Sequence, residues 1–280
     1  MPYAPSAEAR LYFEEAGSGY PVIFVHEFAD DCRSWAGQMH WFSRHYRCIA
    51  FNARGYPPSD IPESDEAYGY EHAVTDIAAV MRHLGLDRAH IVGLSMGGYA
   101  TLVFGLRYPH MASALVVAGC GSGSEPSYRE TYLRDVMARA ERFRVEGAAA
   151  IVDEASNDAT RGQLRRKDPH GYDDFLRRLG EHSGVGSAWS LRNFQGKRPA
   201  LHEFETELKK LSVPMLVITG DEDDHCLQPG LYLKRMVASA GLWVVPRTGH
   251  AVNLEEPAAF NAMVQEFFGA VERGSWQPND

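Results

Sequence analysis

The chain has 280 residues, of which 45% are hydrophobic and 23% charged, a composition typical of a globular protein with one large core. Its 37 acidic and 28 basic residues give a formal net charge of −9, and no basic stripe suited to duplex nucleic acid stands out. No segment approaches the roughly 18 apolar residues of a membrane helix, and the amino terminus lacks the pattern of a secretory signal. We therefore expect no nucleic-acid partner, no membrane insertion and a cytoplasmic location, while the oligomeric state stays open.

Short β-branched and apolar runs alternate with helical patterns, which predicts a mostly parallel central sheet flanked by helices. Predicted strands occupy residues 11–14, 22–25, 48–51, 90–92, 114–118, 214–219 and 242–245. Helical patterns end near residues 85, 107 and 271. The first two strands are separated by Gly17-Ser18-Gly19, and we expect them to form a hairpin.

The alternation is interrupted after Gly119, where glycines, serines and a proline precede about eighty residues of helix-like sequence without a clear strand. The simplest interpretation is an all-helical insertion between two strands of the sheet. We therefore predict an α/β core domain formed by residues 1–123 and 212–280, with a helical cap at residues 124–211 inserted into it.

The four cysteines are widely spaced and form no C-x-x-C pair; they are Cys32, Cys48, Cys120 and Cys226. This spacing favours reduced thiols over a disulfide framework or a metal site. Cys120 follows a predicted strand end, where a lone cysteine is usually a small apolar side chain and not a nucleophile.

A G-x-S-x-G pattern, Gly93-Leu94-Ser95-Met96-Gly97, stands where a predicted strand ends and a helix begins. A serine nucleophile at such a point needs a very sharp turn, and small residues two positions before and after it let neighbouring backbone pass. The positive end of the helix dipole also favours a developing oxyanion. An idle serine in a glycine-rich turn is the weaker interpretation in this context. Ser95 is therefore the expected nucleophile.

A serine hydroxyl needs a neighbouring base, and His250 is the candidate for that role. It stands in a loop that follows the predicted strand 242–245 and precedes the last helix. Loops at the carboxyl ends of parallel strands face one crevice, so His250 and Ser95 can converge there. This setting distinguishes His250 from the other histidines.

The base in turn needs a carboxylate that orients its ring and stabilises the imidazolium. The segment after the predicted strand 214–219 offers four: Asp221, Glu222, Asp223 and Asp224. Such acidic clusters usually serve as turn and cap residues, and the pattern alone does not choose among the four.

Together these motifs resemble the α/β-hydrolase fold superfamily over almost the whole chain. The matching pieces are Val25-His26, Asn52-Ala53-Arg54-Gly55 with Ser59-Asp60, the elbow Gly93–Gly98, Gly220–Asp223, Gly249-His250 and Glu255-Glu256-Pro257. The resemblance implies that the acid is Asp223, three residues after the glycine, with Asp221 and Asp224 as weaker candidates. The order Ser95, Asp223, His250 is also the nucleophile–acid–base order of this fold.

Two positions depart from the superfamily's pattern. Relatives usually carry His-Gly in the oxyanion loop, where this chain reads His26-Glu27-Phe28. The resemblance implies that the backbone N–H groups of Phe28 and Met96 form the oxyanion hole, and a glycine there normally relieves crowding. An ionised carboxylate aimed at an oxyanion is unfavourable, so we expect Glu27 to point away or to be hydrogen-bonded. Asn52, in place of the usual aspartate, is expected to be structural.

A serine at the elbow argues against the dehalogenases and epoxide hydrolases that resemble this chain but use an aspartate there. The resemblance then implies acyl transfer to water, with a small ester or lactone as the preferred substrate and no cofactor or metal. One alternative is a carbon–carbon bond hydrolase, although the glycine-rich run of those enzymes is missing after His26. Others are a cofactor-free perhydrolase or haloperoxidase and a non-catalytic ligand-binding homologue.

The candidate pocket residues are Glu27, Cys120, Trp189 and Phe194. Trp189, Phe194 and Phe204 could line an apolar pocket under the cap, but the cap's own core is the preferred interpretation. Three arginines, Arg165, Arg192 and Arg198, could recognise a substrate carboxylate. A surface position is the expected interpretation for each of them.

Overall fold

The computed structural model describes residues 2–156 and 159–278. Its centre is an eight-stranded sheet with the order β1-β2-β4-β3-β5-β6-β7-β8. Strands β3 to β8 run parallel, β2 is antiparallel to both of its neighbours, β4 and β1, and β1 forms the edge of the sheet. The strands are β1 (Tyr3–Ser6), β2 (Ala9–Ala16), β3 (Tyr20–Val25), β4 (Tyr46–Phe51), β5 (Ala89–Leu94), β6 (Ala112–Ala118), β7 (Met215–Gly220) and β8 (Ala240–Val245). The expected α/β fold with a mostly parallel sheet is confirmed.

The hairpin expected at the amino terminus is wrong. Strand β2 pairs antiparallel with β4, in the register Phe13↔Phe51, while β3 lies between β4 and β5. The last four residues of β3 are buried, so this strand needs a covered position inside the sheet. Strand β2 has several exposed residues and fits near the edge. The edge strand β1, which the sequence analysis did not predict, then pairs with β2.

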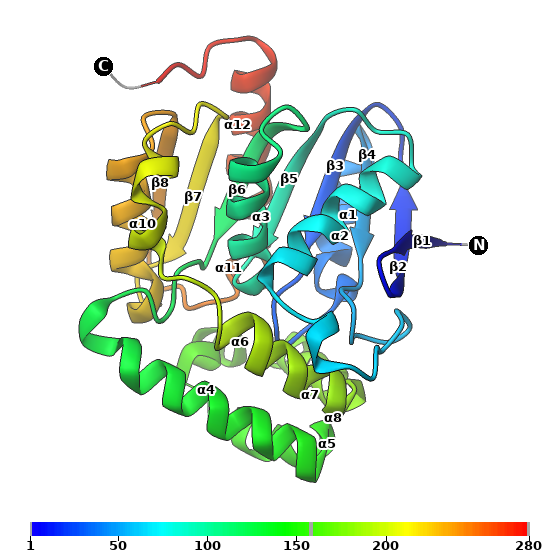
Figure 1. The fold of residues 1–280 in the computed structure, drawn as a ribbon. Helices are drawn as coiled ribbons and strands as arrows, with labels where there is room; N and C mark the ends of the chain where they lie inside the picture. Colours follow the sequence, from blue (N-terminus) through cyan, green and yellow to red (C-terminus); the bar gives the residue numbers. More distant parts are fainter. Residues whose placement is uncertain (1, 157–158, 279–280) are drawn as a thin grey trace.

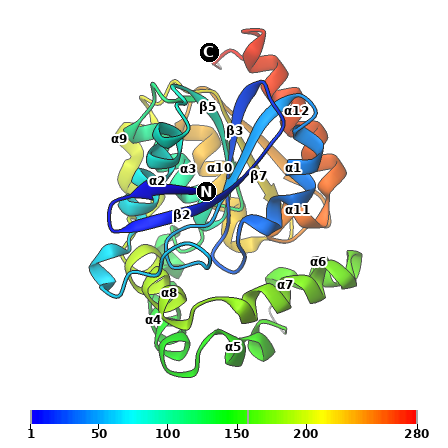
Figure 2. The ribbon, with the colours of Figure 1, turned by 90° about the vertical axis from the view of Figure 1, so that its right-hand side faces the viewer.

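Helices cover both faces of the sheet, as Figures 1 and 2 show. One face packs against α2 (Tyr70–His83), α3 (Met96–Arg107) and α10 (Asp224–Met236). The other packs against α1 (Ala36–Phe42) and α12 (Pro257–Glu272). This layering buries both faces of the parallel strands and leaves the strand ends to carry polar loops. None of the described helices is both long and apolar enough to cross a membrane.

Between β6 and β7 the described residues form helices and no strand. We call residues 124–211 the cap; it contains α4 (Pro126–Glu146), α5 (Ala148–Ala155), α6 (Gly162–Lys167), α7 (Pro169–Glu181), α8 (Gly184–Trp189), a π-helical turn (Ser190–Gln195) and α9 (Glu205–Leu208). Helices α4 to α8 lie across one end of the sheet (Figures 1 and 2). They share an apolar cluster that includes Phe143, Ile151 and Phe175. That the cap is a separate domain stays a prediction.

Two of the cap aromatic residues belong to a different cluster. Phe194 and Phe204 pack with Tyr99 in the core between the sheet and α3. They therefore attach the carboxyl-terminal part of the cap to the sheet domain. Trp189 is half-buried, with the guanidinium of Arg192 5.8 Å from its ring centre.

Candidate active site

Ser95 sits on a strained turn between β5 and α3. Its φ of 56° and ψ of −113° are uncommon for a residue other than glycine. Two glycines make the turn possible. A Cβ on Gly93 would lie 2.2 Å from the carbonyl oxygen of Gly97, and a Cβ on Gly97 would lie 2.1 Å from that of Val25. The second contact also brings the start of α3 against the end of β3, where the loop 26–28 begins.

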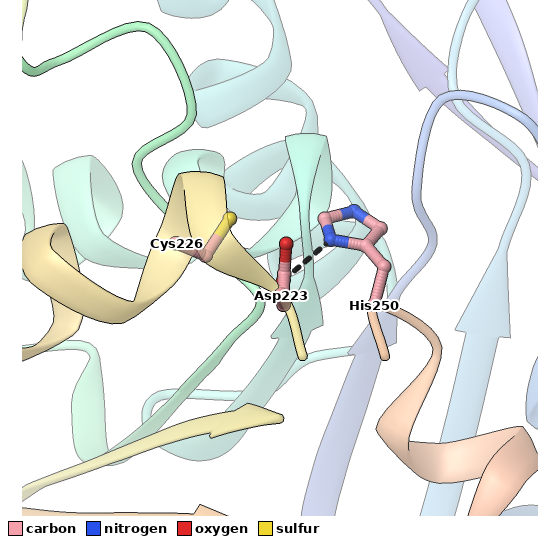
Figure 3. Close-up of side chains that lie close together, drawn as sticks. All are labelled: Asp223, Cys226 and His250. Atoms are coloured by element: carbon pink, nitrogen blue, oxygen red, sulfur yellow. Dashed lines mark hydrogen bonds and ion pairs between the residues drawn. The ribbon is translucent and has the colours of Figure 1, made fainter. Parts of the chain in front are cut away.

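His250 and Asp223 meet across the ends of β7 and β8. The Nδ1 atom of His250 lies 2.7 Å from Oδ2 of Asp223 (Figure 3). Gly220 permits this approach, because a Cβ there would lie 2.1 Å from the carbonyl oxygen of Thr248. Asp223 is buried, whereas Asp221, Glu222 and Asp224 are exposed. Of the four acidic residues in this segment, Asp223 is the one bonded to His250.

Asp223 and His250 each stabilise the charged form of the other. Burial raises the pKa of Asp223, but the charge of His250 and the hydrogen bond to it outweigh that effect, and the pKa of Asp223 ends below its ordinary value. Burial disfavours the imidazolium of His250, yet the charge of Asp223 and the shared hydrogen bond raise the pKa of His250 above 6.5. Because its protonated form is stabilised, neutral His250 is a stronger base toward a neighbouring hydroxyl than a free imidazole.

Cys226 lies next to the acid. Its thiol, on the first turn of α10, is beside the Asp223 carboxylate (Figure 3). Burial raises the pKa of Cys226 well above its ordinary value, so the sulfur keeps its proton. One ligand atom each from Asp223, Cys226 and His250 lie within 4.8 Å of one another, a donor set that could also hold a metal ion. The hydrogen bond between Asp223 and His250 already accounts for two of these three groups.

Ser95, Asp223 and His250 line one cavity of about 490 Å³ between the sheet and the cap. The sheet domain also contributes Glu27 and Phe28 to its wall. The cap contributes apolar and charged side chains, among them Tyr132, Val136, Arg161, Phe175, Leu191 and Arg198. Within the described part of the chain, Cys120, Trp189 and Phe194 are not among the lining residues, and Cys120 and Phe194 are buried in the sheet-side core.

The loop after β3 is held in place by His26. Its Nδ1 lies 2.6 Å from the carbonyl oxygen of Glu27, and its Nε2 accepts a hydrogen bond of 2.9 Å from the N–H of Ala53. Burial lowers the pKa of His26, so the ring is neutral and its two nitrogens serve as one donor and one acceptor. Among the described residues, the N–H groups of Phe28 and Met96 have no hydrogen-bond acceptor.

Glu27 is buried and forms an ion pair with Arg161 of the cap. The guanidinium of Arg161 also lies 5.0 Å from the ring centre of Phe175. The preceding residue, Thr160, accepts a hydrogen bond of 3.2 Å from the N–H of His250 through its carbonyl oxygen. The segment 160–161 of the cap thus contacts both the loop after β3 and the histidine loop.

Arg161 is not among the arginines that the sequence singled out, which are Arg165, Arg192 and Arg198. Its signal was indirect: a carboxylate at position 27 must find a cation once it is buried. Arg165 and Arg192 are exposed, as expected. Arg198 is buried and lines the cavity, so its expected surface position is wrong.

Asn52 has a structural role. Its side-chain oxygen accepts a hydrogen bond of 2.9 Å from the N–H of Cys32, and its amide nitrogen donates one of 2.7 Å to the carbonyl oxygen of Pro57. The residue is buried between these two loops. An amide suits this site because it supplies one donor and one acceptor, whereas an ionised aspartate only accepts.

A model of the alpha/beta hydrolase family matches residues 22–263 of the chain. The chain is similar to 2-hydroxy-6-oxo-2,4-heptadienoate hydrolase from Pseudomonas putida, with 28% identity over 287 residues that cover 96% of each protein. It is also similar to 3-oxoadipate enol-lactonase 2 from Acinetobacter baylyi, with 25% identity over 249 residues, 87% of this chain and 86% of the relative. The solved enol-lactonase from Burkholderia xenovorans matches with a TM-score of 0.82 and 22% identity, covering 96% of this chain and 100% of that one. Because the family model spans most of its length, this chain belongs to the alpha/beta hydrolase family and is a hydrolase.

Proposed function

We propose that the protein is a serine hydrolase that acts on a small ester or lactone through Ser95, His250 and Asp223. The observation that carries the proposal is the 2.7 Å contact between His250 Nδ1 and Asp223 Oδ2 in the same cavity as the strained Ser95. This contact engages Nδ1, so Nε2 is the ring nitrogen that remains to act on the serine. The cavity volume of about 490 Å³ is suited to a small-molecule substrate.

The proposed reaction has two halves. The Ser95 hydroxyl attacks the carbonyl carbon while His250 Nε2 takes its proton and then passes it to the leaving group. The acyl group is now bonded to the Ser95 oxygen. A water molecule, deprotonated by His250, attacks the same carbon and releases the acid, which restores the serine. No metal or organic cofactor is needed for either half.

In both halves the carbonyl oxygen becomes negative, and the N–H groups of Phe28 and Met96 are proposed to bind it. Removing one such donor in other hydrolases lowers the rate by roughly 10²–10³-fold. The carboxylate of Glu27 lies on the same loop, and its ion pair with Arg161 keeps this negative charge compensated. Such a charge would otherwise oppose the developing oxyanion.

The test is labelling with a fluorescent fluorophosphonate, followed by turnover of p-nitrophenyl esters of increasing acyl length. We expect the wild type to be labelled and to hydrolyse short esters, and Ser95→Ala to lose both while keeping its melting temperature. Ser122→Ala is the matched control, because Ser122 lines the same cavity but is not at the elbow. Labelling that survives in Ser95→Ala, or is lost in Ser122→Ala, contradicts the assignment of the nucleophile.

A second candidate, hydrolysis of a carbon–carbon bond beside a ketone, is favoured by the similarity to the Pseudomonas putida hydrolase. The same triad serves both reactions, so the substrate decides between them. The test mixes the purified wild type with 2-hydroxy-6-oxo-2,4-heptadienoate and follows the loss of the dienoate absorbance. The resulting kcat/KM is compared with that for p-nitrophenyl esters. A kcat/KM for the dienoate far above that for every ester would replace the first proposal by the second.

A further inference from the structure

Arg198 is a buried cation in the wall of the candidate active-site cavity. Its side chain is on the cap segment that follows the π-helical turn, and the residue is 4% exposed. Its Nη2 donates to the carbonyl oxygen of Ser122 at 2.8 Å and to the hydroxyl of Tyr132 at 2.9 Å. The guanidinium carbon lies 4.7 Å from the ring centre of Tyr99 and 5.7 Å from that of Tyr132.

These contacts orient the guanidinium but do not neutralise it. Among the described residues, no carboxylate lies within ion-pair distance of Arg198, and its Nε and Nη1 atoms donate no hydrogen bond. The Tyr132 hydroxyl is directed by its own donation to Oε1 of Gln195, at 2.9 Å, so it accepts from Arg198. The N–H groups of Nε and Nη1 are therefore free to donate to a ligand in the cavity that Arg198 lines.

The acidic side chains that line the same cavity are already matched. Each has a basic partner among the described residues; the pairs are Glu27–Arg161, Asp135–Arg134, Glu154–Arg142 and Asp223–His250. None of these four carboxylates forms an ion pair with Arg198. Burial alone lowers the pKa of Arg198, but the surrounding tyrosines and cysteines raise it above the ordinary value, so the group stays cationic. A buried cation without an anion is costly and is typically retained where a ligand supplies the anion.

We propose that Arg198 binds a carboxylate group of the substrate, so that the enzyme selects esters or lactones that carry a negative charge away from the scissile carbonyl. This inference rests on the proposed hydrolase function of the same cavity. Both hydrogens of Nη2 are engaged by Ser122 and Tyr132, so the carboxylate would accept a charge-assisted hydrogen bond from Nη1 or Nε. Tyr99 and Tyr132 hold the plane of the guanidinium and exclude water from its faces.

The experiment compares two pairs of esters that differ in one carboxylate. The first pair places it on the acyl side (p-nitrophenyl butyrate and p-nitrophenyl hemisuccinate), and the second on the leaving group (phenyl acetate and 3-carboxyphenyl acetate). We expect the wild type to favour the charged member of one pair by roughly 10- to 100-fold in kcat/KM, because a charge-assisted hydrogen bond to Arg198 is lost with the neutral member. The pair that shows the preference locates Arg198 on the acyl or the leaving-group side.

Two substitutions assign the preference to the residue. Arg198→Met keeps most of the side-chain volume and should abolish the preference while changing the neutral ester's kcat/KM only a few-fold. Arg198→Lys keeps the positive charge but not the fixed donor directions of the guanidinium, so it should retain part of the preference for the charged ester. Arg192→Met, on an exposed arginine of the preceding π-helical turn, is the matched control and should keep the full preference.

A binding measurement separates this inference from the proposed function. Succinate should raise the melting temperature of the wild type and of Ser95→Ala more than neutral succinamide does, and this difference should vanish in Arg198→Met and shrink in Arg198→Lys. If the wild type treats both members of both pairs alike and binds succinate no better than succinamide, the inference is overturned. If esters are not hydrolysed at all but succinate binds through Arg198, the hydrolase proposal fails and the anion site stands. If Arg198→Met does not fold, Arg198→Lys tests the inference instead. Its preference for the charged ester and its stabilisation by succinate should both be smaller than those of the wild type.

Discussion

Glu27 stands where a glycine would leave the oxyanion loop uncrowded, and its accommodation depends on a residue 134 positions away. Side chains of both Glu27 and Arg161 are almost completely buried, so each would be an uncompensated charge without the other. The pair also joins the loop after β3 to the cap. A substitution of one partner should therefore affect stability and catalysis together.

Replacing Arg161 by Met should destabilise the protein by on the order of 3 to 5 kcal/mol, because it strands the Glu27 carboxylate in a buried site. The double variant Glu27→Gln with Arg161→Met should recover most of that loss, since no buried charge remains. Urea unfolding of the wild type, both single variants and the double variant measures the coupling. Strictly additive losses would show that the two side chains do not act as a pair. Arg165→Met, on an exposed arginine four residues away, is the control.

His250 must be neutral to accept the serine proton, and its pKa is raised by Asp223. The rate should therefore fall as the pH drops through that raised pKa, which places the acid limb of kcat/KM above 6.5. Asp223→Asn should move the limb to lower pH and reduce kcat/KM, on the order of 10⁴-fold as in other triads. The exposed neighbour Asp224 serves as the control, because Asp224→Asn should leave both unchanged. An acid limb that stays in place in Asp223→Asn would contradict the proposed role of this carboxylate.

At the scale of elements, glycines at strand ends decide which loops can meet. Gly220 ends β7, and its missing side chain lets the backbone of Thr248 and Gly249 pass at close range. The contacts are with backbone oxygen atoms, which cannot rotate away as a flexible side chain could. The distance between Asp223 and His250 therefore depends on the absence of one methyl group.

Gly220→Ala should push the β7 and β8 loops apart, lower the stability by roughly 1 to 3 kcal/mol and reduce kcat/KM further than that loss of folded protein explains. Gly230→Ala is the comparison, because a Cβ at this position in α10 makes an ordinary contact of 3.5 Å with Val217. Replacing a glycine inside a helix by alanine should stabilise it by about 0.5 to 1 kcal/mol. Thermal unfolding and ester hydrolysis check both variants, and equal behaviour of the two would refute the steric argument.

At the scale of the whole molecule, the cavity exists because the cap lies over the strand ends. Ion pairs tie the two parts together at several points: Glu27–Arg161, Asp30–Arg178, Arg33–Glu181 and Glu256–Lys167. The Asp30–Arg178 pair, at 2.7 Å, is largely buried, as is the Glu27–Arg161 pair. Salt screens buried ion pairs only weakly. We therefore expect these two pairs to contribute most to holding the cap in its position over the strand ends.

Much of this arrangement could be predicted from local pattern. Gly93, Ser95 and Gly97 lie within five consecutive residues, so the small residues that the turn requires can be recognised in the sequence. In the structure, Ser95 has the expected strained backbone with a positive φ. His250 and Asp223 each follow a parallel strand, so the common edge of the sheet brings them together. The hairpin prediction failed because strand pairing depends on long-range burial: β3 is covered on both faces and β2 is not, which nearness in the sequence cannot reveal.

Local sequence patterns are enough to predict the α/β class, the turn at Ser95, the two loops that carry Asp223 and His250, and the helical segment between β6 and β7. These features depend on short-range rules of periodicity, backbone conformation and strand order, which neighbouring residues encode. Three features become visible only in the folded chain: Arg161 neutralises Glu27, Arg198 is buried in the cavity wall, and β4 separates β2 from β3. A buried charge or a covered strand pairs with groups that are near in space and far in sequence. The free-energy cost of leaving such a charge or strand without a partner arises only when folding removes it from water.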